Sequence, residues 1–240
     1  MKEVLDLLNH THQLDLPIKK FTKKEVNLAI RRLNQLKAPG YDLITAKIIR
    51  ELSEEGITFL TQLYNAILRR GFVPLQWKVA QIIIILKPGK CAEDVKSYRP
   101  ISLLSIPSKI LEVLFLKRLM PIIETNQLIP DHQFGFRQNH STIEQIHRLV
   151  GKINTTFEQK KYCSAAFLDV SQAFDRVWHE GFLFKIKSLL PINFYDFIKS
   201  YLSNRHFFVK QREEVTNLYT IQACVPGQCD RPNPVPHIYI

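Results

Sequence analysis

The chain contains 240 residues, 45% of them hydrophobic, and carries a formal net charge of +11 at pH 7. This hydrophobic content excludes an intrinsically disordered chain, and the length suffices for one good core or two small lobes. The positive charge favours a partner built of phosphates, because each neutralised phosphate releases counterions, although charge alone is a modest argument.

No segment of the sequence resembles a signal peptide or a membrane span. The longest apolar run, residues 82–86, is far shorter than the roughly 20 residues that a helix needs to cross a bilayer. The cysteines form no C-x-x-C pair and have no histidine at zinc spacing. We therefore expect no membrane association, and reduced thiols in an intracellular protein of the nucleus or cytoplasm.

The first predicted element is a helix over residues 22–36. Thr22 and Glu25 have the spacing of a capping box, and apolar residues recur on one face behind them. The other face is basic, which a solvated surface explains better than contact with nucleic acid. A Pro-Gly turn, K-A-P-G-Y-D, follows at residues 37–42, and residues 45–70 have helical periodicity that is interrupted near Gly56.

Residues 79–86 form an apolar run that predicts a buried strand, and K-P-G-K at residues 87–90 predicts a turn after it. The string S-Y-R-P-I-S-L at residues 97–103 then leads into a helix. Two cations on a hairpin at the end of a rigid strand suit a triphosphate, because lysine offers a point charge and arginine a bidentate fork. A basic surface loop is the alternative.

A core helix with one basic face is predicted over residues 101–124. The loop Q-F-G-F-R at residues 133–137 follows, and Ser141 with Glu144 predicts the cap of a further helix. Its apolar face, which we expect to point to the core, consists of Ile143, Ile146, Val150 and Ile153. His140 is interpreted as a loop residue near the helix start, without a catalytic role.

The apolar, β-prone residues 165–168 precede a first acid, Asp169, and a helix-forming segment that carries a second acid, Asp175. A carboxylate at the end of a buried strand can bind a hard divalent cation such as Mg²⁺. From these residues alone, an ordinary strand end and helix cap is the better interpretation, because such turns favour Asp and Ser.

The remaining elements are two helices over residues 182–190 and 194–202, separated by Pro191. Residues 207–210 and 218–221 flank a polar turn at Glu213 and Glu214, which predicts a β-hairpin.

In their order, these strings resemble the reverse transcriptases of non-LTR (LINE-type, jockey-like) retrotransposons. The resemblance runs nearly unbroken from residue 37 to residue 225. It rests on K-A-P-G-Y-D at 37–42, S-Y-R-P-I-S-L at 97–103, Q-F-G-F-R at 133–137 and D-V-S-Q-A-F-D-R-V-W-H at 169–179.

The resemblance implies roles for single residues of the first palm motif. Asp169 would be the catalytic carboxylate that holds both Mg²⁺ ions of a two-metal site, and the Val170 carbonyl would be a further ligand. The ring of Phe174 would lie beneath the incoming sugar, where it can exclude a 2′-hydroxyl by contact.

The resemblance also implies residues that bind the substrates. Lys87 and Arg99 would hold the incoming deoxynucleoside triphosphate, with Lys90 as the second candidate to Lys87. The backbone of Gly135 and the side chain of Arg137 would contact the nucleic acid, which is an RNA template paired with a DNA primer.

The fold implied is α+β: right-hand polymerase fingers over residues 1–160 and an incomplete palm over residues 161–226, with the thumb absent. The second acidic pair, of the form aromatic-x-D-D, is not in the sequence. Codons permitted for residues 227–237, read with a shift of one base, allow G-S-V-T-G-P-T-L-Y-L-I, which is similar to the family's sequence. We therefore expect residues 227–240 to be an out-of-frame tail and the fragment to be inactive.

Two alternatives remain open. The chain could be a non-catalytic remnant that binds nucleic acid with the same basic faces. It could also derive from a related right-hand polymerase, such as a group II intron maturase or telomerase, although K-A-P-G and S-Y-R-P-I-S-L disfavour this. The oligomeric state is not predicted.

Overall fold

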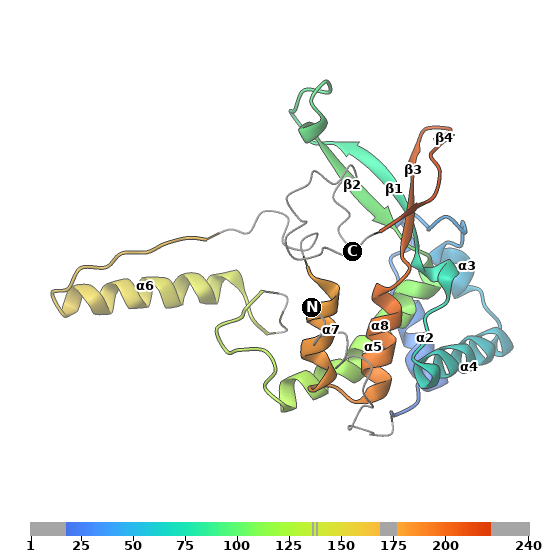
Figure 1. The fold of residues 1–240 in the computed structure, drawn as a ribbon, viewed down its shortest axis with the longest axis horizontal. Coiled ribbons are helices and arrows are strands. Elements are labelled where there is room, and N and C mark those ends of the chain that lie inside the picture. Colours follow the sequence, from blue (N-terminus) through green and yellow to red (C-terminus); the bar gives the residue numbers. More distant parts are fainter. Residues whose placement is uncertain (1–17, 136, 138, 169–176, 222–240) are drawn as a thin grey trace. The chain divides into compact units, whose positions relative to one another are not determined.

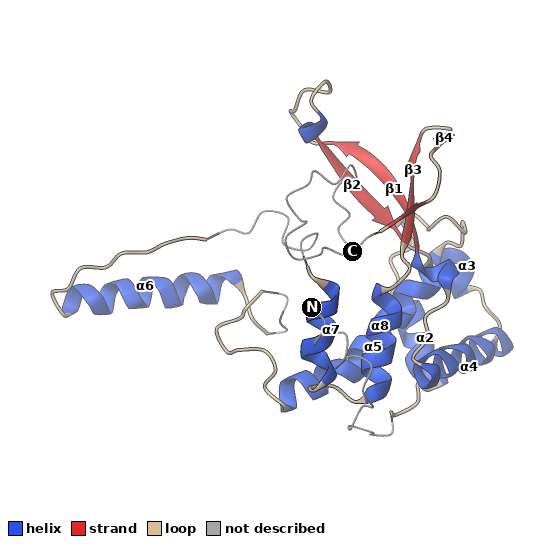
Figure 2. Cartoon of the chain, viewed as in Figure 1, coloured by secondary structure: helices blue, strands red, loops and turns tan. Residues whose placement is uncertain are grey.

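The computed structural model describes residues 18–135, 137, 139–168 and 177–221, which form two compact units (Figure 1). One unit comprises Met1–Met120 with Gln172–Ile240, and the other is Pro121–Ser171. Helices and strands occur together, so the predicted α+β class is confirmed (Figure 2). Among the described residues, no helix is long and apolar enough to span a membrane.

Side chains cap the starts of four helices, α2, α3, α4 and α6, whereas α7 and α8 begin without a side-chain cap. Their bounds are α2 Lys23–Arg31, α3 Ala46–Arg50, α4 Glu54–Arg70, α5 Ile106–Thr125, α6 Thr142–Glu158, α7 His179–Lys187 and α8 Ile192–Leu202, with short 3₁₀ turns at Leu75–Lys78 and Val95–Ser97. The two predicted capping boxes are confirmed, at Thr22 with Glu25 and at Ser141 with Glu144.

Several predicted helix bounds differ from the observed ones, among them the predicted helices 182–190 and 194–202, which are α7 His179–Lys187 and α8 Ile192–Leu202. Hydrogen bonds explain two of the differences. Helix α2 ends at Arg31 instead of residue 36, because the Arg50 guanidinium donates to the carbonyls of Arg31 and Leu33 and so satisfies the end of the helix. The interruption predicted near Gly56 lies at residues 51–53. There Ser53 caps α4 by accepting a hydrogen bond from the Gly56 N–H at 3.2 Å.

The sheet has the strand order β2-β1-β3-β4, and β5 also pairs with β3. The strands are β1 Val79–Leu86, β2 Tyr98–Leu103, β3 His206–Gln211, β4 Glu214–Val215 and β5 Tyr219–Thr220. Strands β1 and β2 are antiparallel, whereas β1 and β3 are parallel. The predicted strand 79–86 and the predicted terminal hairpin, β3 with β5, are confirmed.

Residues 101–103 belong to β2 and not to the helix that follows, so the predicted helix start at residue 101 is wrong. Pairing with β1 decides this, because Ile83 and Ile101 are partners in the antiparallel ladder. Helix α5 instead begins at Ile106, after Ser105 accepts a hydrogen bond from the Ser108 N–H at 3.3 Å.

The sheet and the helices of the first unit both bury apolar side chains. Ala80, Ile82, Leu104 and Phe207 pack on one face of the sheet. Between the helices, the Phe115 ring of α5 stacks on Phe197 of α8 with centroids 3.9 Å apart. Strand β1 belongs to the predicted fingers region and β3 to the predicted palm region, yet the two strands share one sheet. The predicted boundary near residue 160 therefore divides the chain by function, and it stays a prediction.

The prediction that the apolar side of α6 points to a core is wrong within the unit Pro121–Ser171. No described residue of α6 is buried, and Ile143 is 66% exposed. The apolar spacing correctly predicted the helix, but the described residues of Pro121–Ser171 do not bury that side.

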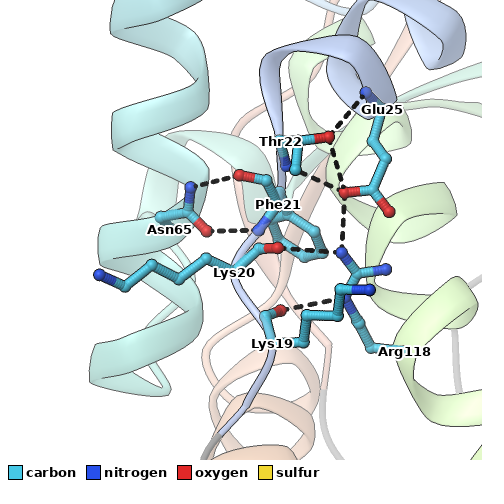
Figure 3. Close-up of polar contacts among 7 residues, drawn as sticks. All are labelled: Lys19, Lys20, Phe21, Thr22, Glu25, Asn65 and Arg118. Atoms are coloured by element: carbon cyan, nitrogen blue, oxygen red, sulfur yellow. Dashed lines mark hydrogen bonds and ion pairs between the residues drawn. The ribbon is translucent and has the colours of Figure 1, made fainter.

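The start of the described chain is held to the helices by a polar network (Figure 3). Arg118 of α5 donates to the carbonyls of Lys19 and Lys20 and lies 2.8 Å from the Glu25 carboxylate. Asn65 of α4 exchanges two hydrogen bonds with the backbone of Phe21. These contacts fix the segment before α2 against α4 and α5.

This network predicts a pH dependence of stability. The hydrogen bond from Arg118 lowers the pKa of Glu25 to about 2, from 4.5 in an unfolded chain. The stability that the ionised Glu25 carboxylate contributes to the fold is therefore present above pH 4.5 and is lost as the pH falls toward 2. We expect the difference in unfolding free energy between the wild type and Glu25→Gln to shrink by about 1 kcal/mol from pH 7 to pH 3. Urea denaturation at the two pH values measures it, and a constant difference would contradict the assignment.

Candidate nucleotide-binding site

The loop between β1 and β2 is held by its own hydrogen bonds. The Lys87 N–H donates to the Ser97 carbonyl at 2.8 Å, and the Tyr98 hydroxyl donates to the Ala92 carbonyl at 2.8 Å. Gly89 has a φ of +71°, a conformation that favours glycine, so the predicted turn at residues 87–90 is confirmed. Figure 2 shows β1 and β2 leading from the helices of this unit to the loop.

The hairpin brings the two predicted phosphate-binding cations together. Arg99 is the partner of Ile85 in the ladder, and Lys87 continues the ladder opposite Ser97. Side chains two residues apart in a strand share a face. Lys87 and Arg99 therefore occupy diagonal positions on one face, where long side chains separated by about 7–8 Å at their origins can act on one group.

The two cations differ in their contacts. The Lys87 ammonium donates to the Lys96 carbonyl at 2.6 Å, which holds it beside the loop. Arg99 is exposed, and its guanidinium makes no hydrogen bond or ion pair with the part of the chain that the structure describes. Lys90 is exposed on the turn. Arg99 is thus available to an anionic ligand. To bind the same ligand, Lys87 would give up its hydrogen bond to the neutral Lys96 carbonyl.

Apolar side chains surround Arg99 on the same face. Ile85, its direct partner, is 48% exposed, and Ile101 is 42% exposed. A guanidinium between apolar neighbours has less competing water, so its attraction to a phosphate is stronger there than on a fully polar surface.

The predicted metal ligands, Asp169 and Val170, and the predicted sugar contact, Phe174, lie outside the described residues. Within the described ranges, no group of three or more His, Cys, Asp or Glu side chains could hold a metal ion. The catalytic roles of these three residues therefore stay predictions.

The predicted template contact Arg137 takes part in an ion pair within its own unit. Its Nη2 lies 2.9 Å from Glu124 Oε2, and this hydrogen bond raises the pKa of Arg137. The Gly135 carbonyl accepts a hydrogen bond from the Gln133 amide at 3.3 Å. The roles of Gly135 and Arg137 in nucleic-acid contact stay predictions.

Sequence reasoning missed the structural role of Gly40 in the K-A-P-G turn. A Cβ atom at this position would lie 2.6 Å from the Ser105 nitrogen and 2.7 Å from the Leu104 carbonyl carbon. The turn therefore packs directly on the backbone that joins β2 to α5. The Pro-Gly pair signalled a turn, but nothing in the sequence signalled this long-range approach.

Sequence reasoning also missed two buried cations at the starts of β1 and β3. Lys78 and Arg205 are each 2% exposed, although an isolated lysine or arginine beside an apolar run ordinarily predicts a surface residue.

Residues 85–226 match the sequence model of the family described as reverse transcriptase (RNA-dependent DNA polymerase). The chain is 47% identical over 225 residues to the probable RNA-directed DNA polymerase from transposon BS of Drosophila melanogaster, 42% identical over 226 residues to that from transposon X-element, and 43% identical over 225 residues to the RNA-directed DNA polymerase from mobile element jockey. Each alignment covers 94% of this chain and 25% of the relative, so the chain spans about a quarter of their length. Agreement in the order of motifs, in the matched domain and in identity along nearly the whole chain shows that it belongs to the reverse transcriptase family, among the jockey-like sequences of non-LTR retrotransposons.

Proposed function

We propose that this chain is the part of an RNA-directed DNA polymerase that holds the incoming deoxynucleoside triphosphate. The observation that carries the proposal is the placement of Lys87 and Arg99 on one face of a rigid antiparallel hairpin. A triphosphate carries several negative charges, and Arg99 has no competing partner among the described residues. Membership of the reverse transcriptase family supports this choice of ligand.

In this proposal, Asp169 and the carbonyl of Val170 supply oxygen ligands of the kind that Mg²⁺ prefers. When bound, Mg²⁺ would neutralise the charge that develops on the transferred phosphate. Phe174 would select deoxyribose by excluding a 2′-hydroxyl. The reaction is attack of a DNA primer 3′-hydroxyl on the α-phosphate, with RNA as template and pyrophosphate as the leaving group.

We propose that the Gly135 backbone and Arg137 contact the template. Arg137 already holds one anion, the Glu124 carboxylate. A nucleic-acid phosphate would bind Arg137 by replacing this carboxylate. Such an exchange would depend on salt, because each phosphate contact releases counterions.

We further propose that these 240 residues do not polymerise by themselves. The sequence contains no Asp-Asp pair, and the family match ends at residue 226, next to the predicted shift of frame at residue 227. A two-metal reaction needs carboxylates on both sides of the transferred phosphate. The alternative function, binding of nucleic acid without catalysis, is favoured by the same missing pair and by the positive net charge.

The binding part of the proposal predicts the effect of single substitutions in the hairpin. We expect Arg99→Ala and Lys87→Ala each to weaken binding of a deoxynucleoside triphosphate by roughly 10-fold to 100-fold, since each removes a charge-assisted hydrogen bond worth about 1.5–3 kcal/mol. Titration calorimetry on the 240-residue chain measures this.

Lys47→Ala is the matched control, because it removes an equal charge from an exposed position of α3, outside the hairpin. Binding should then change by less than about threefold, the size of an exposed electrostatic effect. If all three variants lost affinity equally, general positive charge and not a built nucleotide site would explain binding. Unchanged affinity in Arg99→Ala would contradict the proposal outright.

A further inference from the structure

A third cation lies on the sheet face that carries the two predicted phosphate-binding cations. Strand β1 lies between β2 and β3, and Gln81 of β1 pairs with both neighbours (Figure 1). Its partner in β2 is Leu103, four residues after Arg99. Its partner in β3 is Phe208, two residues before Lys210. Side chains an even number of residues apart in a strand share a face, so Lys210 lies on the face of Arg99. We call Lys87, Arg99 and Lys210 the cation triangle.

Lys210 has no anionic partner in the part of the chain that the structure describes. Its ammonium forms no ion pair and no hydrogen bond there. The acid of β4, Glu214, pairs with Gln211 and therefore lies on the opposite face of the sheet. On its own face, Lys210 is half-buried and pairs with Val215, which is apolar. The three N–H donors of its ammonium are thus available to a ligand.

The cation triangle encloses an exposed apolar side chain, Ile85. Ile85 is 48% exposed and is the direct partner of Arg99. Continuing the parallel register by one residue puts Lys210 beside Ile83. With strands about 4.8 Å apart and a rise of about 3.3 Å per residue, Lys210 originates roughly 12 Å from Arg99 and roughly 14 Å from Lys87. The three side chains can therefore contact one ligand above Ile85 if that ligand itself spans part of the gap.

We propose that Lys210 is the third phosphate-binding cation of the nucleotide site, and that the cation triangle selects a triphosphate by its length. Lys87 and Arg99 hold the other phosphates, so this role of Lys210 rests on the proposed function. A triphosphate offers each of the three cations a phosphate of its own. A diphosphate has one phosphate fewer, so it would leave Lys210 without a partner.

The arrangement of the cations favours a nucleotide over a strand of nucleic acid. The three side chains surround one point of the sheet and do not follow a line. The charges of a triphosphate are concentrated in one group, whereas those of a polynucleotide are distributed along its backbone. The cation triangle therefore matches the triphosphate.

Titration calorimetry on the 240-residue chain, with a deoxynucleoside triphosphate and with the matching diphosphate, tests the role of Lys210. Lys210→Ala should weaken triphosphate binding about tenfold, the lower end for a charge-assisted hydrogen bond, and diphosphate binding by less than about threefold. Lys210→Arg keeps the charge and should bind the triphosphate within about threefold of the wild type. Lys117→Ala is the matched control, because Lys117 is also half-buried but lies in α5, and both affinities should be unchanged.

Unchanged triphosphate binding in Lys210→Ala beside weakened binding in Arg99→Ala would overturn the role of Lys210 and leave the proposed function standing. Equal losses for the two nucleotides would overturn selection by length. A loss confined to the binding of a short single-stranded RNA would assign Lys210 to nucleic acid and overturn its place in the nucleotide site. If Lys210→Ala unfolds at lower urea than the wild type, Lys210→Gln repeats the test, because it keeps most of the aliphatic stem beside Val215 and removes the charge.

Discussion

Gly40→Ala is expected to destabilise the first unit by about 3 kcal/mol, at the upper end of the usual cost of overpacking a tightly packed site. The added methyl group would lie 2.6–2.9 Å from three backbone atoms of Leu104 and Ser105, and backbone cannot swing away as a flexible side chain does. Strand β2 and helix α5 would have to move together, because residues 104 and 105 join them. Urea denaturation at pH 7 measures the loss.

Gly151→Ala is the matched control for this prediction. Gly151 lies in α6, and a Cβ atom there has no neighbour within 4 Å. Alanine is the better helix former by about 1 kcal/mol, so this variant should be equally stable or more stable than the wild type. A loss in Gly151→Ala as large as that in Gly40→Ala would show that the close approach to Ser105 is not the cause.

Asp169→Asn is expected to abolish polymerisation in a whole polymerase that carries this region. Its carboxylate is the proposed ligand of both metal ions, and the metals contribute several kcal/mol to transition-state stabilisation, which corresponds to a rate loss of about a thousandfold or more. Asparagine keeps the shape of the side chain and removes its charge. Single-nucleotide incorporation under saturating deoxynucleotide measures the rate.

Glu93→Gln provides the comparison for Asp169→Asn, since Glu93 is an exposed carboxylate of the β1–β2 loop with no described contact. Its incorporation rate should stay within about twofold of the wild type. Retained activity in Asp169→Asn would remove Asp169 from the catalytic site, whatever the family of the chain.

Local signals in the sequence predicted most of the elements correctly. The apolar run at residues 79–86 predicted β1 to the residue, and the capping boxes at Thr22 and Ser141 predicted the starts of α2 and α6. These signals work because the hydrogen bonds that they describe join residues a few positions apart. That Lys87 and Arg99 share one hairpin was also predictable, because they flank the turn after the apolar run, whereas their binding of phosphate stays a prediction.

Features that depend on distant partners were not predictable in the same way. The helix predicted over residues 101–124 includes residues 101–103, yet pairing with β1 makes these residues a strand. The parallel pairing of β1 with β3 joins residues more than 100 positions apart. The surroundings of Gly40, Lys78 and Arg205 likewise come from segments that only the folded chain brings together.

The measurement that tests the central claim most directly is primer extension on an RNA template with Mg²⁺ and deoxynucleotides. It compares the 240-residue chain with a chain continued from residue 227 in the shifted frame of the gene, each with and without Asp169→Asn. We predict incorporation by the continued chain alone, and its loss in Asp169→Asn. Incorporation that survives Asp169→Asn in the continued chain would contradict a polymerase site built on this carboxylate.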